Sequence, residues 1–222
     1  MDFSNNFTRA IQTFMTVYGM KESDTNGRAI DVDGNPIPMY TYPCIEYLRT
    51  IDWTGADVFE YGGGNSTGFW LDQGCNVTVV EHNKEWVEKI DERANIIHEE
   101  DMEKFVNTPL CQGKKFDVII IDGGSGLGAR YDCVEPSLHM IKRKGMIIFD
   151  SSEWHINTTR ILNKQHQFIP VHFNGFMPLL DTTTTTTCYI SRDFYRETKK
   201  LNPIGSTTVN LESSLVDKSM KE

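Results

Sequence analysis

The stretch VFEYGGGNSTGFW, residues 58–70, decides the fold. Its apolar run ends in an acid, Glu60, and three consecutive glycines follow at Gly62, Gly63 and Gly64. Glycine loses more conformational freedom on folding than any other residue, so three in a row indicate that the backbone has to approach another group closely. A glycine-rich turn between a strand and a helix also presents free N–H groups to the anionic part of a ligand. The stretch therefore predicts a strand, a ligand-binding loop and a helix.

Further apolar, β-branched runs alternate with helix-like segments along the chain. This alternation is typical of a parallel sheet with helices on both faces. The expected strands cover residues 56–61, 76–81, 94–99, 115–122 and 145–150, and the expected helices cover 65–74, 83–93, 101–106, 131–145 and 153–165. Two extended segments, 166–178 and 182–194, then follow without a crossover helix and predict an antiparallel hairpin at the end of the sheet. The sequence thus predicts a Rossmann-like α/β fold.

Three regions are expected along the chain. Residues 1–52 form a helical lead-in, with an amphipathic helix at 7–20, a turn-rich link and a second helix at 44–51. Residues 53–196 form the ligand-binding domain. Residues 197–222 form a polar tail rich in Ser and Thr, whose composition is typical of segments that do not pack.

Composition and charge exclude several classes of protein. The 222 residues carry a formal net charge of −9, which disfavours binding to a phosphate backbone, and no apolar run is long enough to span a membrane. The N-terminus lacks the pattern of a secretory signal, so a cytoplasmic location is expected. The five cysteines are scattered and never form a C-x-x-C pair, which argues against a disulfide framework and a structural zinc site.

The glycine loop distinguishes between two classes of cofactor. The dinucleotide fingerprint G-x-G-x-x-G, counted from Gly62, needs glycine at position 67, where this chain has Thr67. The pattern acid-x-G-x-G is met by Glu60, Gly62 and Gly64, and Ser66 and Thr67 add hydroxyls at the start of the helix. Such a loop suits a ligand with an amino-acid end, because N–H groups bind its carboxylate while Glu60 binds its ammonium group.

Three further acids follow expected strands. Glu81 ends the second strand, where an acid can accept both hydroxyls of a ribose; alternatively it is a charge at a helix N-terminus. Asp101, after the third strand, can bind an adenine amino group or cap its helix. Asp122 ends the most apolar strand, at the edge where open α/β sheets bind ligands.

With these residues in order, the chain resembles the class I S-adenosylmethionine-dependent methyltransferases over residues 40–195. The motifs that carry the resemblance are FEYGGGNSTGFW, VVEHN, FDVIIIDG, KGMIIFD and the closing hairpin. The resemblance implies a seven-stranded, mostly parallel sheet in the order 3-2-1-4-5-7-6 with the seventh strand antiparallel, and S-adenosyl-L-methionine as the cofactor. One departure is Ser66, where many members have a third glycine.

The resemblance also implies the residues of the site. Glu60 and the loop would line the methionine part, Glu81 the ribose, His82 and Asp101 the adenine side, and Asp122 the edge that faces the acceptor. The full set of expected cofactor-binding residues is Glu60, Gly62, Gly63, Gly64, Asn65, Ser66, Thr67, Glu81, His82, Asp101 and Asp122. In the lead-in, Thr41 and Tyr42 either close over the cofactor or, for Tyr42, pack in the core.

Methyl transfer to a hydroxyl needs orientation and the removal of one proton. His155 and Asp150 are the expected catalytic residues, with Asp122 as a further candidate base; a histidine near a helix start is alternatively an exposed polar residue. Asp122 and Asp150 match two magnesium-ligand positions of the catechol O-methyltransferase branch, but two oxygens are too few for a magnesium site, so no metal is expected. Arg130 and Tyr131 are candidates for contact with the acceptor, or surface residues.

These observations favour methylation of an oxygen of a small molecule or a sugar. The alternatives are an NAD-dependent oxidoreductase, which Thr67 and the hairpin disfavour, and a cofactor-binding protein without catalysis. A nucleic-acid methyltransferase is a further alternative, and the negative charge weakens it.

Overall fold

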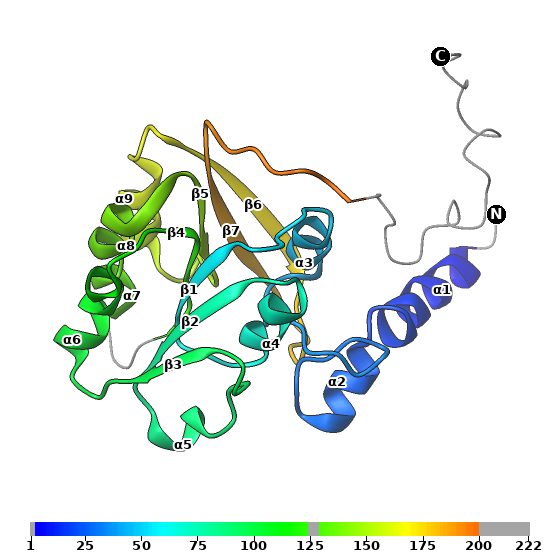
Figure 1. Ribbon diagram of the computed structural model, residues 1–222. Helices are drawn as coiled ribbons and strands as arrows, with labels where there is room; N and C mark the ends of the chain where they lie inside the picture. The colour runs from blue at the N-terminus through cyan, green and yellow to red at the C-terminus, as the bar shows by residue number, and fades with distance from the viewer. Residues whose placement is uncertain (1–2, 124–128, 200–222) are drawn as a thin grey trace, which may run out of the picture.

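A seven-stranded sheet forms the centre of the computed structural model, which describes residues 3–123 and 129–199 of the chain (Figure 1). The strands are β1 (Asp57–Tyr61), β2 (Asn76–Glu81), β3 (Asn95–His98), β4 (Phe116–Ile121), β5 (Ile141–Phe149), β6 (Phe168–Phe176) and β7 (Thr183–Ser191). Their order is β3-β2-β1-β4-β5-β7-β6. Strands β1 to β5 pair in parallel, whereas β7 is antiparallel to both β5 and β6. The predicted α/β fold, strand order and antiparallel seventh strand are confirmed.

Helices cover both faces of this sheet (Figure 1). On one face lie α3 (Tyr42–Arg49) and α4 (Asn65–Asp72), and on the other lie α6 (Met102–Asn107), α7 (Ala129–Asp132), α8 (Val134–Met140) and α9 (Ile156–Asn163), with the 3₁₀ turn η1 (Thr108–Gln112) after α6. The short α5 (Lys84–Val87) follows β2. At the N-terminal end, α1 (Phe3–Thr16) and α2 (Met20–Asn26) lie to one side of the sheet (Figure 1).

The core is divided by the sheet into two apolar clusters. Along β1, Val58 contributes to the cluster under α3 and α4, whereas its neighbour Phe59 contributes to the cluster on the opposite face. Both side chains are completely buried. Successive side chains of a strand point to opposite faces, so a strand buried on both faces has a continuous apolar sequence. This is why the apolar runs predicted the central strands well.

The threonine run lies in β7, as predicted, and its hydroxyls link the sheet to the loops beside it. Thr186 is fully buried, donates a hydrogen bond to Asp150 Oδ1 at 2.7 Å and accepts one from Thr41 N at 3.0 Å. On the opposite face of β7, the Thr187 hydroxyl lies 2.7 Å from the Ser152 hydroxyl and 2.9 Å from His172 Nδ1. The run therefore fixes both the lead-in and the loop after β5.

Two helices differ from their predicted extents. The helix expected at 83–93 ends at Val87, and Asp91 then forms a turn in which its Oδ1 accepts a hydrogen bond from Arg93 N at 3.0 Å. The helix expected at 131–145 is divided into α7 and α8, and the chain is already extended at Ile141. Ile141 pairs with Phe116, and the register shifts before Met146, so the first residues of β5 form a bulge that periodicity does not reveal.

The lead-in reaches the carboxyl ends of the central strands. Besides the two expected helices it contains α2, which the sequence did not predict. Its Thr41 bonds to β7 and also donates from Oγ1 to the Phe173 carbonyl at 3.0 Å. Of the expected polar tail, Glu197 accepts a hydrogen bond from Asp52 N at 2.9 Å, and residues 200–222 lie outside the described part of the chain. Among the described residues, no helix has the length and apolar character of a membrane span.

Candidate functional site

The glycine loop after β1 meets the loop after β4 backbone to backbone. Gly62 has φ +81°, and a Cβ placed on it would lie 2.6 Å from the Cα of Gly123. A Cβ on Gly123 would lie 2.4 Å from the Cα of Gly62. No side chain fits at either position, and the positive φ favours glycine at position 62 for a second reason. The two loops thus form a close-packed floor at the carboxyl ends of β1 and β4.

The other two glycines have different environments. A Cβ on Gly63 would collide with Ile90 Cδ1 at 2.5 Å, so packing beneath the loop requires glycine there. The Gly63 carbonyl accepts a hydrogen bond from the indole N–H of Trp86 at 2.6 Å. Gly64 is extended, with φ 174°, and the nearest atom to a Cβ on it would be the Trp86 Nε1 at 3.9 Å. Gly64 therefore leaves space on the cavity side of the loop.

Glu60 lies beneath this loop, with no solvent exposure. Its Oε2 accepts a hydrogen bond from Thr67 Oγ1 at 2.6 Å, and the same hydroxyl accepts one from Gly64 N at 3.2 Å. Neither its Oε1 nor the buried hydroxyl of Tyr40 has a hydrogen-bond partner of regular geometry among the described residues, although Ser66 lies near enough to Glu60, and Trp70 near enough to Tyr40, to affect the pKa of each group. Burial raises the pKa of Glu60 to about 7, and the Thr67 hydrogen bond opposes the shift. Buried polar atoms without such partners fit a ligand with hydrogen-bonding groups.

Glu81 joins the two halves of the predicted binding site. Its side chain is nearly buried, its Oε1 accepts from Asn83 N at 2.8 Å, and its Oε2 accepts from Gly63 N at 3.3 Å. His82 Nδ1 lies 3.1 Å from Oε1. Glu81 therefore fixes the glycine loop to the loop after β2 while its carboxylate remains at the wall of the cavity.

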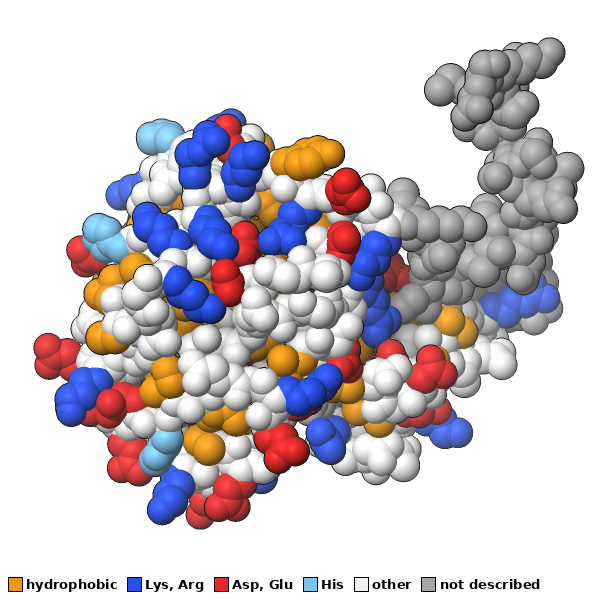
Figure 2. All heavy atoms as spheres, viewed as in Figure 1, with side chains coloured by type: hydrophobic (Ala, Val, Ile, Leu, Met, Phe, Trp, Pro, Cys, Tyr) orange, Lys and Arg blue, Asp and Glu red, His pale blue; other side chains and the backbone are white. Residues whose placement is uncertain are grey.

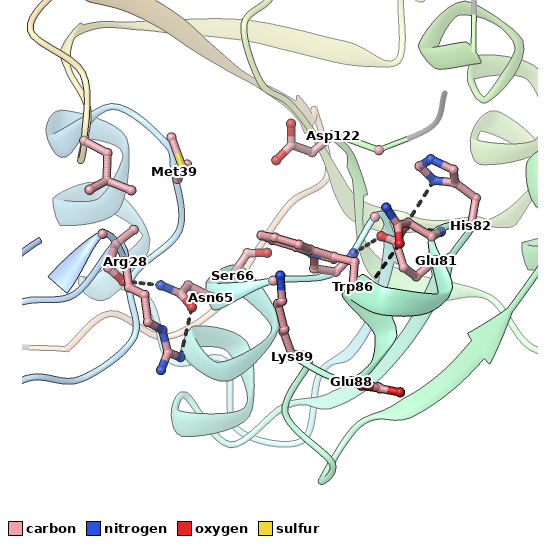
Figure 3. A pocket seen from close by; sticks show the side chains of 18 residues that line it. Arg28, Met39, Asn65, Ser66, Glu81, His82, Trp86, Glu88, Lys89 and Asp122 are labelled. Carbon is pink, nitrogen blue, oxygen red and sulfur yellow. Dashed lines mark hydrogen bonds and ion pairs between the residues drawn. The ribbon is translucent and has the colours of Figure 1, made fainter. Parts of the chain in front are cut away.

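A cavity of about 880 Å³ opens above these loops (Figure 3). Its lining combines the glycine loop, the start of α4, the loop after β2, the α5 region, Asp122 and parts of the lead-in. The lining residues are Gly27, Arg28, Ala29, Met39, Gly62, Gly63, Gly64, Asn65, Ser66, Glu81, His82, Asn83, Trp86, Glu88, Lys89, Asp122, Gly123 and Leu179. This volume is within the range of small-molecule and cofactor sites.

Asn65 connects the start of α4 to the lead-in. Its Nδ2 donates to the Ala29 carbonyl at 2.7 Å, and its Oδ1 accepts from Arg28 at 3.3 Å (Figure 3). Both ends of the amide are thus used to hold the lead-in beside the cavity. Ser66, the departure from a third glycine, also lines the cavity.

A second group of polar residues lies at the carboxyl ends of β4 and β5. Arg130 pairs with Asp122 Oδ1 at 2.8 Å and donates to the carbonyl of Asp150 at 2.9 Å, which links the two strand ends. His155, which immediately precedes α9, lies close enough to Asp122 and Arg130 for their charges to affect its pKa. Burial and Arg130 lower the pKa of His155, and Asp122 and Glu153 oppose the shift. Burial and the Arg130 charge therefore favour the neutral imidazole of His155.

Asp150 is nearly buried and both of its oxygens accept hydrogen bonds. Oδ1 accepts from Thr186 Oγ1 at 2.7 Å, and Oδ2 accepts from Ser151 Oγ at 2.8 Å. Burial and the nearby charge of Asp122 raise the pKa of Asp150 to about 7, and the two hydroxyl groups oppose the shift. Asp150, at the end of β5, therefore links three parts of the structure: its side chain accepts a hydrogen bond from Thr186 of β7, and its carbonyl accepts one from Arg130.

The expected cofactor residues fall into three groups. Gly62, Gly63, Gly64, Asn65, Ser66, Glu81, His82 and Asp122 all line the cavity. Glu60 and Thr67 lie beneath it and support the loop. Asp101 lies apart from the lining and caps α6, accepting from Glu103 N at 3.0 Å and Lys104 N at 3.2 Å.

Tyr42 takes one of its two predicted positions, and several residues of the cavity lining were not predicted from the sequence. Tyr42 is buried and packs edge-on against Tyr18, which is the core-packing alternative. No sequence pattern indicated that Arg28, Met39, Lys89 or Leu179 lies at the cavity, since these residues come from the lead-in, the segment after α5 and the hairpin loop. Only the proximity of Trp86 to Glu81 in sequence could have suggested that this tryptophan forms part of the wall.

Charged side chains of both signs are interspersed on the face shown in Figure 2. Among the described residues, Lys114 and Lys142 pair with Asp57, Lys142 pairs also with Asp117, and Arg143 pairs with Asp193. Within the basic segment at 142–145, Lys142 and Arg143 are thus paired with acids, and Lys144 is exposed without an ion pair to a described residue. Within the described ranges, no group of three or more His, Cys, Asp or Glu residues is arranged to hold a metal ion.

A scan against protein-family models and a search of curated proteins find no match to the sequence. Solved structures do match. The methyltransferase candidate SMU.1697c from Streptococcus mutans, solved in complex with SAH, is 8% identical, with a TM-score of 0.51 over 69% of this chain and 99% of that one. An rRNA-methylase candidate from Clostridium thermocellum is 11% identical, with a TM-score of 0.52 over 71% of this chain and 99% of that one.

A third match is a precorrin-6y C5,15-methyltransferase from Geobacter metallireducens, also 11% identical, with a TM-score of 0.52 over 76% of this chain and 96% of that one. At this identity the similarity shows the fold alone. The chain has the Rossmann-like fold of the class I S-adenosylmethionine-dependent methyltransferases.

Proposed function

We propose that the chain binds S-adenosylmethionine and transfers its methyl group to a hydroxyl oxygen of a small molecule or a sugar. The observation that carries the proposal is the cavity itself: its floor is the glycine loop after β1, and the acid that ends β2, Glu81, forms its side. The Glu60 Oε1, buried and without a hydrogen-bond partner of regular geometry among the described residues, adds an acceptor for an ammonium group beneath the loop. In the proposal, Gly62–Ser66 hold the amino-acid end and Glu81 holds the ribose.

S-adenosylmethionine, when bound, supplies a methyl carbon that its sulfonium makes electrophilic. The chain has to orient an acceptor oxygen towards that carbon and remove its proton. His155 is the proposed base, because its lowered pKa favours the neutral imidazole, which can accept a proton, and it lies close enough to the cavity residue Asp122 for the two charges to interact. Asp150, whose two oxygens are both engaged, holds Thr186 and the end of β5 in place.

The charge of the protein favours an acceptor without a phosphate backbone. A net charge of −9 repels a phosphate backbone, and Lys142 and Arg143 of β5 are paired with acids. This favours a small acceptor over RNA, although one matching structure is an rRNA-methylase candidate. An acceptor with an ionisable or alcoholic hydroxyl suits the group formed by Asp122, Arg130 and His155.

The test is a transfer assay on a panel of phenols and sugars, with mass spectrometry for products heavier by one methylene. We expect His155→Ala to lower kcat on the accepted substrate by about a hundredfold or more, the usual effect of losing a general base, without changing the affinity for S-adenosylhomocysteine. His139→Ala, at an exposed position on α8, is the control and keeps full activity. Equal turnover in both variants contradicts the role of His155. Absence of transfer to every acceptor by a protein that binds the cofactor points to a binding protein without catalysis.

A further inference from the structure

The charged side chains that line the cavity differ in whether they form ion pairs. Of the acids in the lining, Asp122 pairs with Arg130, Glu81 accepts hydrogen bonds from Gly63 N and Asn83 N, and Glu88 forms no ion pair with a described residue. Arg28 and Lys89 also line the cavity, but neither forms an ion pair with any described residue. The cavity therefore has two positive groups whose charges are not matched within the described part of the protein.

Lys89 is placed by the turn that follows α5. Its backbone N–H donates to the Trp86 carbonyl at 2.9 Å, and its Nζ lies 4.7 Å from the centre of the Trp86 ring. Figure 3 shows the ammonium group extending towards the space between Trp86 and Ser66, while the carboxylate of Glu88 points in another direction. Contact with the aromatic face holds a lysine side chain in one direction.

Arg28 reaches the same region from the lead-in. Its guanidinium donates to Asn65 Oδ1 at 3.3 Å, and the second bond of Asn65, to the Ala29 carbonyl, fixes the backbone beside it. A guanidinium has five N–H donors, so this one contact leaves donors available. The two cations thus approach the start of α4 from different elements, the lead-in on one side and the α5 region on the other (Figure 3).

We propose that Lys89 and Arg28 bind the carboxylate of the cofactor's amino-acid end. The inference rests on the proposed function and assigns these two residues to it. The carboxyl oxygens of Glu60, beneath the glycine loop, and of Asp122, in the cavity lining, lie on the β1 and β4 side, and Lys89 and Arg28 provide positive charge on the other side. A zwitterionic amino-acid group matches this separation, with its ammonium towards the acids and its carboxylate towards the cations.

The lead-in carries Arg28 to the cavity. Asn65 contributes to this placement by holding residues 28–29 against the start of α4, together with backbone hydrogen bonds of Arg28 to Ser23 and of Ala29 to Ile37. The lead-in thereby becomes part of the cofactor site and selects for ligands that carry a carboxylate. Since both cations are solvent-exposed, their contribution decreases at high ionic strength.

The experiment compares two adenosine thioethers by calorimetric titration. S-Adenosylhomocysteine carries the amino-acid end, and 5′-methylthioadenosine lacks it. We expect Lys89→Ala to weaken S-adenosylhomocysteine binding by about three- to tenfold at low salt and to leave 5′-methylthioadenosine binding unchanged. Arg28→Ala should behave in the same way, and Lys89→Arg should retain most of the affinity. Lys84→Ala, on α5 but outside the cavity lining, is the matched control and binds both ligands as wild type does.

The inference is overturned if Lys89→Ala and Arg28→Ala change the affinities for the two ligands equally, or change neither. In that case the proposed function stands, provided that the wild-type protein binds S-adenosylhomocysteine. If the wild-type protein binds neither ligand, the proposed function fails and the inference fails with it. The two failures are therefore distinguishable in one set of titrations.

Discussion

Glu60 is a carboxyl group without solvent, with one oxygen bound to Thr67 and the other without a hydrogen-bond partner of regular geometry among the described residues. Its raised pKa, about 7, means that the folded protein prefers its protonated form. The usual value of about 4.3 applies in the unfolded chain. The contribution of Glu60 to stability is therefore greatest below that value and is lost as the pH rises through about 7.

We expect Glu60→Gln to increase the stability of the ligand-free protein at pH 8 by about 3 kcal/mol and to change it little at pH 4.5. The amide has no charge to desolvate, which is the physical reason. Denaturant unfolding at the two pH values measures this difference. Glu92→Gln, at an exposed position, is the control and should have no pH-dependent effect. A destabilised Glu60→Gln protein at pH 8 would show that the carboxylate is already compensated without a ligand.

At the residue scale, the sequence indicated that Glu81, Asp122 and the three glycines lie near one another, and the structure places all of them in the cavity lining. The sequence did not distinguish the two roles of Asp101, since capping a helix and binding a ligand need the same carboxylate at the same position. It also missed Arg28 and Lys89, whose importance comes from the tertiary arrangement of the lead-in and the α5 region. Neither residue has a local pattern that indicates a site.

At the scale of elements, the glycine loop contains three glycines with different requirements. Gly62 combines a positive φ with contact to Gly123, whereas Gly64 is extended and faces open space. The first glycine is needed for the close approach of the two loops, and we propose that the third leaves room for a ligand. The different requirements at these glycines cannot be distinguished from the sequence alone.

We expect Gly62→Ala to destabilise the protein by about 3 kcal/mol, because its Cβ has to displace the backbone at Gly123 and φ is unfavourable. Gly64→Ala should retain the stability of the wild type and lose cofactor affinity. Thermal unfolding, combined with titration of S-adenosylhomocysteine, measures both effects. Equal destabilisation by the two substitutions contradicts the different roles assigned to the two glycines.

Element boundaries were the least predictable feature at this scale. The apolar strands β1, β2 and β4 begin and end within a residue or so of their predicted limits, because burial on both faces requires a continuous apolar run. The helix expected at 83–93 is much shorter, because the backbone tightens after Val87 to i→i−3 hydrogen bonds, from Lys89 N to the Trp86 carbonyl and from Ile90 N to the Val87 carbonyl. Ile141 joins the sheet instead of a helix because it pairs with Phe116, a contact that only the folded sheet creates.

At the scale of the whole molecule, the alternation of strands and helices was enough to predict the α/β class, and the resemblance supplied the strand order that the structure confirms. The arrangement of the lead-in could not be predicted. Its position depends on individual bonds, such as Thr41 to Thr186 and Asn65 to Ala29, between residues far apart in sequence. These bonds bring Met39 and Arg28 to the cavity, so the site is a property of the whole chain and not of the glycine loop alone.

The central claim is that the cavity above the glycine loop binds S-adenosylmethionine and not a dinucleotide. Calorimetric titration of the purified protein with S-adenosylhomocysteine and, separately, with NAD tests it most directly. If the cavity binds S-adenosylmethionine, we expect saturable one-to-one binding of S-adenosylhomocysteine, weaker binding in Glu81→Ala, and no binding of NAD. Binding of NAD alone, or the absence of binding by S-adenosylhomocysteine, would contradict it.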